Sequence, residues 1–485
     1  MRLIFMIILL IYGLTSLPQG FAEDALSGSS LPDFGDVASA TMSPQMERRI
    51  GEEAMRQIKA RDPLYVDDPE LSEYLNTLGR LLTGASSGSG QEFEFFAIRD
   101  ETINAFAMPG GYIGVHTGLI LAAQSESELA SVLAHEVSHV TQHHIARLVG
   151  KQNQLSPIGI AGLLVALLAT RSSSDLGQAA FLAAQGGAIQ AQLGYTRDFE
   201  READRIGFQV LQQGGFDANG MVSFFERLQR ATRTYENNAP AYLRSHPLTG
   251  ERIADIQNRV HSSTYHQHLD SVEFHLLRAK LRSDQGIPRD AIAYFQNQLE
   301  GKRYSDEAGT RFGLVSALIR AKDFKRAEAE FRSLRETAPQ HPLIDLLAMR
   351  LKTDSGDLKA AAEIGRGVLL RQPGYRPLRY AYAQSLQNLG QHQEALAQLI
   401  DLSRNYPKDS RAYLLQAQSY GATGQSLLRH RAQAEAYYLQ GAIPAAIEQL
   451  QLAQKVEGGD FYQLSSVEAR LREFRQALAA EQPRR

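Results

Sequence analysis

The sequence of 485 residues predicts a mainly α-helical protein, in which an α+β domain with a small sheet is followed by an α-solenoid. Most segments carry apolar residues at helical spacing, whereas residues 92–98 and 104–120 read as strands. Beyond about residue 265 the composition becomes rich in Ala, Leu, Gln and Arg, with proline at a regular interval. A chain of this length is too long for one core, so at least two domains are expected.

The composition excludes several classes of function. The 51 basic and 54 acidic residues give a net charge of −3, so the chain lacks the electrostatic signature of a nucleic-acid-binding protein, and we expect no nucleic-acid partner. There is no cysteine, which excludes disulfides, thiolate metal sites and a cysteine nucleophile. Neither property fixes the cellular compartment.

Residues 1–22 have the pattern of a secretory signal peptide. Arg2 precedes an apolar run over residues 3–14, and the small-residue pattern Gly-Phe-Ala ends at Ala22. The run is shorter than the ~20 residues that a membrane-spanning helix needs. We therefore expect export across a membrane and cleavage after residue 22, with an uncleaved membrane anchor as the alternative. Residues 23–42 lack periodicity and are expected to form a flexible tail.

The first domain is expected to begin with helices and continue into a sheet. Residues 43–84 read as two helices, the first capped by Ser43 and ending before Pro63, and GASSGSGQ follows as a flexible break. A strand over 92–98 precedes a strand pair in NAFAMPGGYIGVHTGLI, which turns at its Met-Pro-Gly-Gly sequence. Proline cannot donate to a sheet ladder, so this piece is expected at a sheet edge. It is either an edge that aligns an extended substrate or an ordinary hairpin.

The small-residue and apolar stretch over 157–193 allows several interpretations. Its apolar run, PIGIAGLLVALLAT, has 14 residues and is too short to span a bilayer. A buried helical hairpin is the favoured interpretation. The alternatives are a lid over a neighbouring site, a peripheral membrane contact, or insertion into the bilayer.

The segment LAHEVSHVTQHH, inside a helix expected over 125–150, carries a metal-binding pattern. His135 and His139 are four residues apart, so both imidazoles point from one face and can bind one metal ion. Glu136 lies about 100° around the helix, beside the ligands, where a general base for an activated water is needed. This HExxH arrangement predicts a catalytic zinc centre, with a coincidental surface helix as the alternative.

Other candidate residues are less specific when they are considered alone. In TRDFEREAD, Glu200 and Asp204 are again four apart on an expected helix, which could supply a third ligand or form a solvated acidic face. His143 lies one more turn along the ligand face and could support a ligand; the favoured interpretation is that His143 and His144 are both polar residues near a helix end. His116 is expected to be structural.

Together, HEVSH, RDFEREAD about sixty residues later and the upstream NAFAMPGG resemble the zinc metallopeptidases that include the CAAX prenyl proteases, HtpX and Oma1. The resemblance implies a zincin-like metalloprotease domain over 43–262, with one Zn²⁺ held by the two histidines and Glu200. It also implies that Glu136 is the catalytic base and that Asp204 orients a ligand histidine. Thr196 and Arg197 stand where the family often has Ser-Arg, a departure that affects no ligand.

The segment SHPLTGER carries a further pair of candidates. His246 precedes Pro247, so its backbone is expected to be extended. In periplasmic members of the family an equivalent histidine can occupy the fourth zinc position and silence the enzyme. The resemblance therefore makes His246 a candidate inhibitory fourth ligand, and Arg252 either a contact of the transition state or a support for a ligand. The alternative for His246 is a loop histidine near the start of a helix at Glu251.

The second half of the chain repeats with a period of 34 residues. Four sets of residues keep this step, which resembles tetratricopeptide repeats and predicts a solenoid over 263–485 with a concave surface for extended segments of partners. The sets are Pro339, Pro373 and Pro407; Asp323, Asp357 and Gln391; Ala327, Ala361 and Ala395; and Gly356, Gly390 and Gly424.

The combination of a signal peptide, a metallopeptidase domain and repeats resembles that of the family's periplasmic members that serve outer-membrane β-barrel assembly. This implies a zinc endopeptidase with a chaperone-like role, which degrades unfolded or misassembled outer-membrane proteins and docks on the barrel-assembly machinery through its repeats. The competing hypothesis is a repeat-based scaffold or chaperone with a silent or structural zinc site. Glu136 argues against it, because a structural site needs no general base.

Overall fold

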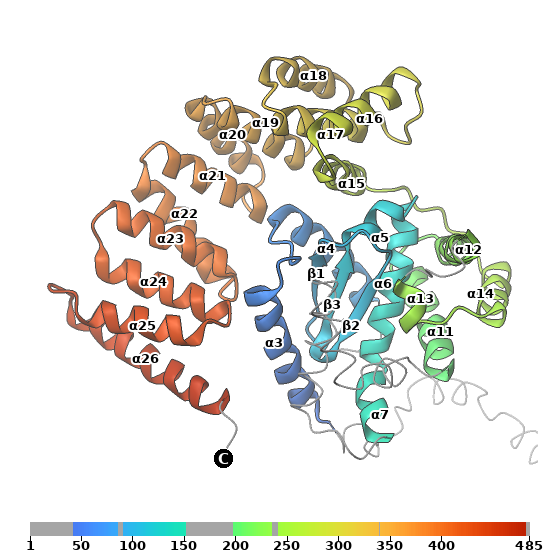
Figure 1. Cartoon of the computed structure of the whole chain (residues 1–485), viewed down its shortest axis with the longest axis horizontal. Helices are drawn as coiled ribbons and strands as arrows, with labels where there is room; N and C mark the ends of the chain where they lie inside the picture. Colours follow the sequence, from blue (N-terminus) through green and yellow to red (C-terminus); the bar gives the residue numbers. More distant parts are fainter. Residues whose placement is uncertain (1–41, 86–90, 152–196, 235–240, 339, 482–485) are drawn as a thin grey trace, which may run out of the picture.

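The computed structural model describes residues 42–85, 91–151, 197–234, 241–338 and 340–481 (Figure 1). The expected signal peptide, most of the expected tail, part of the Gly/Ser-rich break and the stretch 157–193 lie outside the described residues. None of the helices in the described ranges combines the length and the apolar character needed to cross a membrane.

Two helices open the first domain, as the sequence predicts. Helix α3 (Pro44–Arg61) begins at Ser43, whose hydroxyl accepts a hydrogen bond from the Met46 amide at 3.2 Å. Helix α4 (Pro69–Gly84) begins at Asp68, whose carboxylate accepts from the first amides of the helix. The apolar face of α4 packs on strand β1, so these helices cover the sheet.

The sheet has three strands, β1 (Glu94–Ile98), β2 (Ala105–Met108) and β3 (Tyr112–His116), in the order β1-β3-β2. The turn between β2 and β3 is the short 3₁₀ helix η1 (Pro109–Gly111). Gly111 has a φ of +88°, and a Cβ there would lie 2.1 Å from the Glu92 carbonyl oxygen, so only glycine fits.

The predicted edge position holds for β2 and is wrong for β3. Strand β3 pairs antiparallel with β2 and parallel with β1, which places it in the centre of the sheet. The proline that suggested an edge lies in η1 and donates to neither ladder, so it places no restriction on β3.

Helix α6 (Glu126–Thr141) is the central helix of this domain, and its residues 126–140 are all buried. It packs against β2, α11 (Arg197–Gln213) and α12 (Asn219–Thr234), and it follows the short helix α5 (Thr117–Ala122). The helix expected to reach residue 150 instead breaks after Thr141. His143 adopts a φ of +50°, and a separate helix, α7 (His144–Lys151), begins after it.

A glycine sets the distance between α6 and α11. A Cβ at Gly207 would lie 3.1 Å from the backbone of His135, so the lack of a side chain lets the two helices approach closely. This approach brings the acidic residues of α11 next to the histidines of α6. The domain ends with α13 (Ala241–Ser245) and α14 (Gly250–Ser262).

Helices α15 to α26 stack pair upon pair into a solenoid (Figure 1). The repeat markers have physical roles: Ala327, Ala361 and Ala395 are fully buried, and Gly356, Gly390 and Gly424 adopt positive φ after the first helix of a pair. The helices are α15 (Val272–Asp284), α16 (Pro288–Glu300), α17 (Glu307–Arg320), α18 (Phe324–Thr337), α19 (Pro342–Asp354), α20 (Leu358–Arg371), α21 (Arg376–Asn388), α22 (His392–Asn405), α23 (Ser410–Ala422), α24 (Ser426–Leu439), α25 (Ile443–Gln454) and α26 (Phe461–Glu481).

The solenoid curves around the first domain and contacts α4 (Figure 1). Lys280 of α15 lies between Asp68 and Glu70, at 2.7 and 2.6 Å. Arg376 of α21 lies 3.3 Å from Glu73. One apolar cluster runs from the first domain into the repeats, so the two parts share a core.

Candidate metal centre

Three separate segments bring seven polar side chains together beneath the sheet. Helix α6 contributes three of them, α11 two, and the segment that joins α13 to α14 and enters α14 the last two. All seven are at most 4% exposed. They are the site residues expected from the sequence: His135, Glu136, His139, Glu200, Asp204, His246 and Arg252.

Four of these side chains form a group that could hold a metal ion. His135, His139, Glu200 and His246 each offer one ligand atom, and these four atoms lie within 4.8 Å of one another. The Nε2 atoms of His135 and His139 are 2.9 Å apart. Glu200 Oε2 lies 3.5 Å from His135 Nε2, and Oε1 lies 2.9 Å from His246 Nδ1. Imidazole nitrogens and a carboxylate oxygen are the donors that zinc prefers.

Asp204 and Arg252 contact the residues of this group and hold them in position. Asp204 Oδ1 lies 3.0 Å from His135 Nδ1, which directs the other ring nitrogen of His135 toward the group. The Arg252 guanidinium donates to both oxygens of Asp204, at 2.6 and 2.8 Å, and lies 2.8 Å from Glu200 Oε2. It also donates to the Pro247 carbonyl at 2.7 Å. Every arm of this guanidinium is engaged by the protein, so the geometry favours a supporting role over contact with a transition state.

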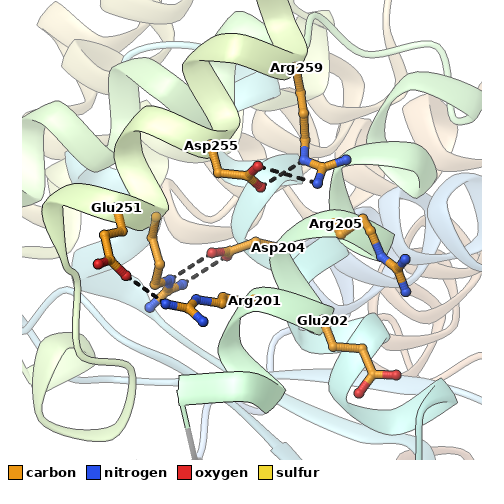
Figure 2. Close-up of a pocket in the computed structure, with 8 residues that line it drawn as sticks. Arg201, Glu202, Asp204, Arg205, Glu251, Asp255 and Arg259 are labelled. Carbon is orange, nitrogen blue, oxygen red and sulfur yellow. Dashed lines mark hydrogen bonds and ion pairs between the residues drawn. The ribbon is translucent and has the colours of Figure 1, made fainter.

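The Asp204–Arg252 pair also lines a cavity of about 460 Å³ between α11 and α14 (Figure 2). Across this cavity Arg201 of α11 bonds to Glu251 of α14 at 2.6 Å, and within α14 Arg259 bonds to Asp255 at 2.8 Å. Arg201 and Arg259 therefore have carboxylate partners of their own, and Asp204 pairs with Arg252.

A chain of side chains that the sequence alone did not assign supports His139. His144 Nε2 lies 3.1 Å from Glu202, whose carboxylate can only accept, so this nitrogen carries the hydrogen. Burial lowers the pKa of His144 to about 4, so the ring is neutral at pH 7 and its Nδ1 is an acceptor. His139 Nδ1, at 2.8 Å, must then donate to it, which leaves the lone pair of His139 Nε2 facing the other ligands.

The structure thus separates the two neighbouring histidines. His144 is buried and supports a candidate ligand, whereas His143 is about one-third exposed and lies 3.1 Å from Glu47 at the helix end. The alternative that His143 supports a ligand is wrong, because it is His144 that contacts His139. The sequence could not show that the helix breaks between the two neighbouring histidines and turns the second one inward.

Glu136 lies beside the candidate ligands. Neither of its carboxylate oxygens has a hydrogen-bond partner within the described ranges, and Oε1 lies 3.4 Å from His246 Nε2. Burial raises the pKa of Glu136, while the neighbouring His246 and His135 oppose that rise. A buried carboxylate with a raised pKa is suited to accept a proton.

The electrostatics of the group favour a cation. Burial alone would raise the pKa of Glu200, but the imidazoles of His246 and His135 hold it well below its usual range. Burial alone would lower the pKa of His135, but Asp204 and Glu200 raise it to about 9. Glu200 and Asp204, whose pKa values are both lowered, therefore remain ionised and stabilise positive charge among the donor atoms. The donor set, its burial and these charges fit a zinc ion.

Tyr242 was not predicted from the sequence. Its ring stacks on His246 with centroids 4.6 Å apart and meets the ring of His135 edge to face at 6.3 Å. Its hydroxyl is buried, and no hydrogen-bond partner for it occurs in the part of the chain that the structure describes. The remaining expected residue, His116, is buried and bonded to Thr102 away from this group.

The chain is similar to known proteins over most of its length. Residues 69–260 match the family described as Peptidase family M48, and residues 352–419 match the tetratricopeptide repeat. The chain is 32% identical to the beta-barrel assembly-enhancing protease of Escherichia coli K12 over 93% of its length and 92% of that protein. It is 32% identical to the Yersinia pestis protein of that name over 86% of both chains. It is 28% identical to the mitochondrial metalloendopeptidase OMA1 of Schizosaccharomyces pombe, over 46% of this chain and 62% of that one.

Proposed function

Because this chain belongs to peptidase family M48 and is a metalloprotease, we propose that it is a periplasmic zinc endopeptidase of outer-membrane protein quality control. Its substrates would be unfolded or misassembled β-barrel proteins, and its repeats would dock on the barrel-assembly machinery. The observation that carries the proposal is the buried group of His135, His139 and Glu200 with the buried carboxylate of Glu136 beside it.

The proposed mechanism assigns each side chain one task. His135, His139 and Glu200 would hold one zinc ion. When bound, zinc supplies Lewis acidity toward a water molecule and a peptide carbonyl. Glu136 would take a proton from the attacking water and return it to the leaving amine. Asp204 would fix the ring of His135, from which it lies 3.0 Å away.

We further propose that His246 holds the enzyme silent. Its Nδ1 is 2.9 Å from Glu200 and its Nε2 is 3.4 Å from Glu136, so the ring occupies the space that a substrate and water would need. The bond from Arg252 to the Pro247 carbonyl and the stacking of Tyr242 hold the segment in this position. Movement of this segment would open the site.

The silencing proposal predicts that His246→Ala increases proteolysis of casein. The increase should occur at unchanged zinc content, because His135, His139 and Glu200 remain. The matched control is His143→Asn, since His143 lies at the end of α6 on Glu47 and not in the group. Unchanged cleavage by a zinc-loaded His246→Ala variant would contradict the silencing role.

Strand β2 supports a way of aligning a polypeptide. It pairs with β3 on one side and forms an edge of the sheet on the other. It also packs on α6, the helix that carries Glu136. An extended segment could add to this edge by backbone hydrogen bonds, which would hold it near the catalytic base independently of its side chains. The stretch 157–193, for which a lid and a membrane contact remain predictions, lies outside the described residues.

The substrate class is supported by the similarity of most of the chain to beta-barrel assembly-enhancing proteases. The test uses the chain from residue 23, a purified β-barrel protein in unfolded and in membrane-assembled form, and casein. We expect the unfolded barrel to be cleaved and the assembled barrel to be spared. Cleavage of casein with no cleavage of the unfolded barrel would contradict the proposed substrate. The scaffold hypothesis predicts binding of the unfolded barrel without cleavage, even by His246→Ala.

A further inference from the structure

A cavity of about 460 Å³ lies where the first repeats meet the metalloprotease domain, away from the metal centre. Helices α15 and α16 and the segment leading into α17 form most of its wall, and Figure 1 shows α15 beside α5. Leu121 and Gln124, just before α6, complete it. We call it the arginine cavity after Arg278, Arg282 and Arg303, which line it.

The arginine cavity has an excess of positive charge. Its three arginines form no ion pair with any residue in the described ranges, although the whole chain has a net charge of −3. The one carboxylate in its wall, Asp306, accepts a hydrogen bond from the Gly309 amide as the cap of α17. His275, also in the wall, lies 3.8 Å from Asp270. The positive charge is therefore not neutralised from within.

Two of the three arginines are held in place by contacts that leave their charge uncompensated. Arg278 donates to the Leu121 carbonyl at 3.4 Å and lies over the Phe274 ring. Arg282 donates to the Gln285 side chain at 2.7 Å and lies over the Tyr294 ring, 5.4 Å from its centroid. Burial and the nearby charge of Arg282 lower the pKa of Arg278. Like charges at a partly buried position are unfavourable, and a bound anion would relieve this repulsion.

We propose that the arginine cavity binds a carboxylate of a polypeptide, presented either by a C-terminus or by an acidic side chain. Planar guanidinium groups bind carboxylates through two parallel hydrogen bonds. The cavity is larger than a simple anion requires, and the rings of Tyr294, Phe295 and Tyr304 can contact the residue that carries the carboxylate. A polypeptide is favoured over a phosphate-bearing lipid because the proposal rests on the proposed function, in which unfolded proteins are the substrates.

The position of the cavity suggests its use. Gln124 donates its backbone hydrogen to Glu128 in the first turn of α6, the helix that carries His135 and Glu136. A polypeptide held in the arginine cavity would therefore be retained against the metalloprotease domain by the repeats. This would let the repeats hold a substrate independently of the metal centre.

The test measures binding without cleavage, so that failure of this proposal is distinct from failure of the proposed function. Glu136→Gln protein, starting at residue 23, is titrated into a fluorescent peptide that has a free C-terminus and one internal glutamate. Matched peptides have an amidated C-terminus, a glutamine in place of the glutamate, or both. We expect the peptide lacking both carboxylates to bind about tenfold more weakly or worse. The two single changes distinguish the sources of the carboxylate.

The protein variants locate the site. Arg282→Gln with Arg303→Gln should weaken binding of the acidic peptide about tenfold or more, and Arg332→Gln, an exposed arginine on α18, should leave it unchanged. Circular dichroism and thermal unfolding establish that the variants are folded. Equal binding of all four peptides, or equal binding by the double variant, would overturn the proposal. So would binding to phosphatidylglycerol vesicles that the double variant loses while its peptide affinity is unchanged.

Discussion

Replacement of His144 by phenylalanine tests whether the relay from His139 through His144 to Glu202 controls metal binding. Phenylalanine keeps the ring that stacks on Phe199, with centroids 4.5 Å apart, but it has no acceptor for the His139 Nδ1 hydrogen. His139 then keeps a buried donor without a partner, and its two tautomers are no longer distinguished. The expected result is weaker zinc binding by a folded protein.

The size of the effect follows from the lost hydrogen bond. Leaving a buried donor unsatisfied costs ~1–3 kcal/mol, which corresponds to about a 5- to 150-fold loss of affinity. Loss of a residue that orients a metal ligand gives a similar range of about 10- to 100-fold. Glu202→Gln should have a smaller effect, because the amide oxygen still accepts from His144 Nε2, the bond that is 3.1 Å long here.

Competition for zinc with a chromogenic chelator at pH 7 measures the affinity of each variant. His143→Asn is the matched control, since it changes the adjacent histidine and asparagine tolerates the positive φ at that position. Urea unfolding of the zinc-free proteins separates metal affinity from stability. The reasoning is refuted if folded His144→Phe binds zinc as tightly as the unaltered protein, or if His143→Asn loses as much affinity as His144→Phe.

Two further predictions concern stability. Tyr242→Phe keeps the stacked ring and removes a buried hydroxyl that has no partner in the described part of the chain, so urea unfolding should give a free energy of unfolding higher by ~1–2 kcal/mol; a lower value would contradict this. Burial alone would raise the pKa of Asp100, but bonds from His116 and Thr102 hold it below its usual range. The ionised Asp100 carboxylate therefore stabilises the folded protein above the unfolded-state pKa of ~3.9, and this stabilisation is lost as pH falls below that value. Between pH 5 and about 2.5, Asp100→Asn should lose less free energy of unfolding than the unaltered protein. Equal losses would show that Asp100 is not responsible.

The fold was predictable where the signal is local. Caps, strand alternation and the 34-residue step depend on residues near one another in the chain, and the helices and strands begin close to the expected positions. The central position of β3 was not predictable in this way, because it depends on parallel pairing with β1 across a non-local connection. The break of α6 after Thr141 was missed because the apolar pattern continues into α7.

The residues of the candidate site were predictable from the sequence, but the hydrogen bonds and contacts among them were predictable only in part. Residue spacing and family resemblance selected the residues that the structure brings within 4.8 Å of one another, and their roles remain predictions. The sequence could not show that Arg252 bonds to Asp204 and also lies against Glu200, since these contacts depend on how α14 packs on α11. The relay through His144 and the stacking of Tyr242 likewise arise from packing between distant segments.

The most direct test of the account compares the protein from residue 23 with its Glu136→Gln variant, each carrying His246→Ala so that the site is open. Zinc content is measured by atomic emission, and cleavage of an unfolded β-barrel protein is measured alongside it. The account predicts about one zinc per chain in both proteins and cleavage only where Glu136 is present. Equal cleavage by both zinc-loaded proteins would contradict the assignment of Glu136, and the absence of zinc from both would contradict the metal centre itself.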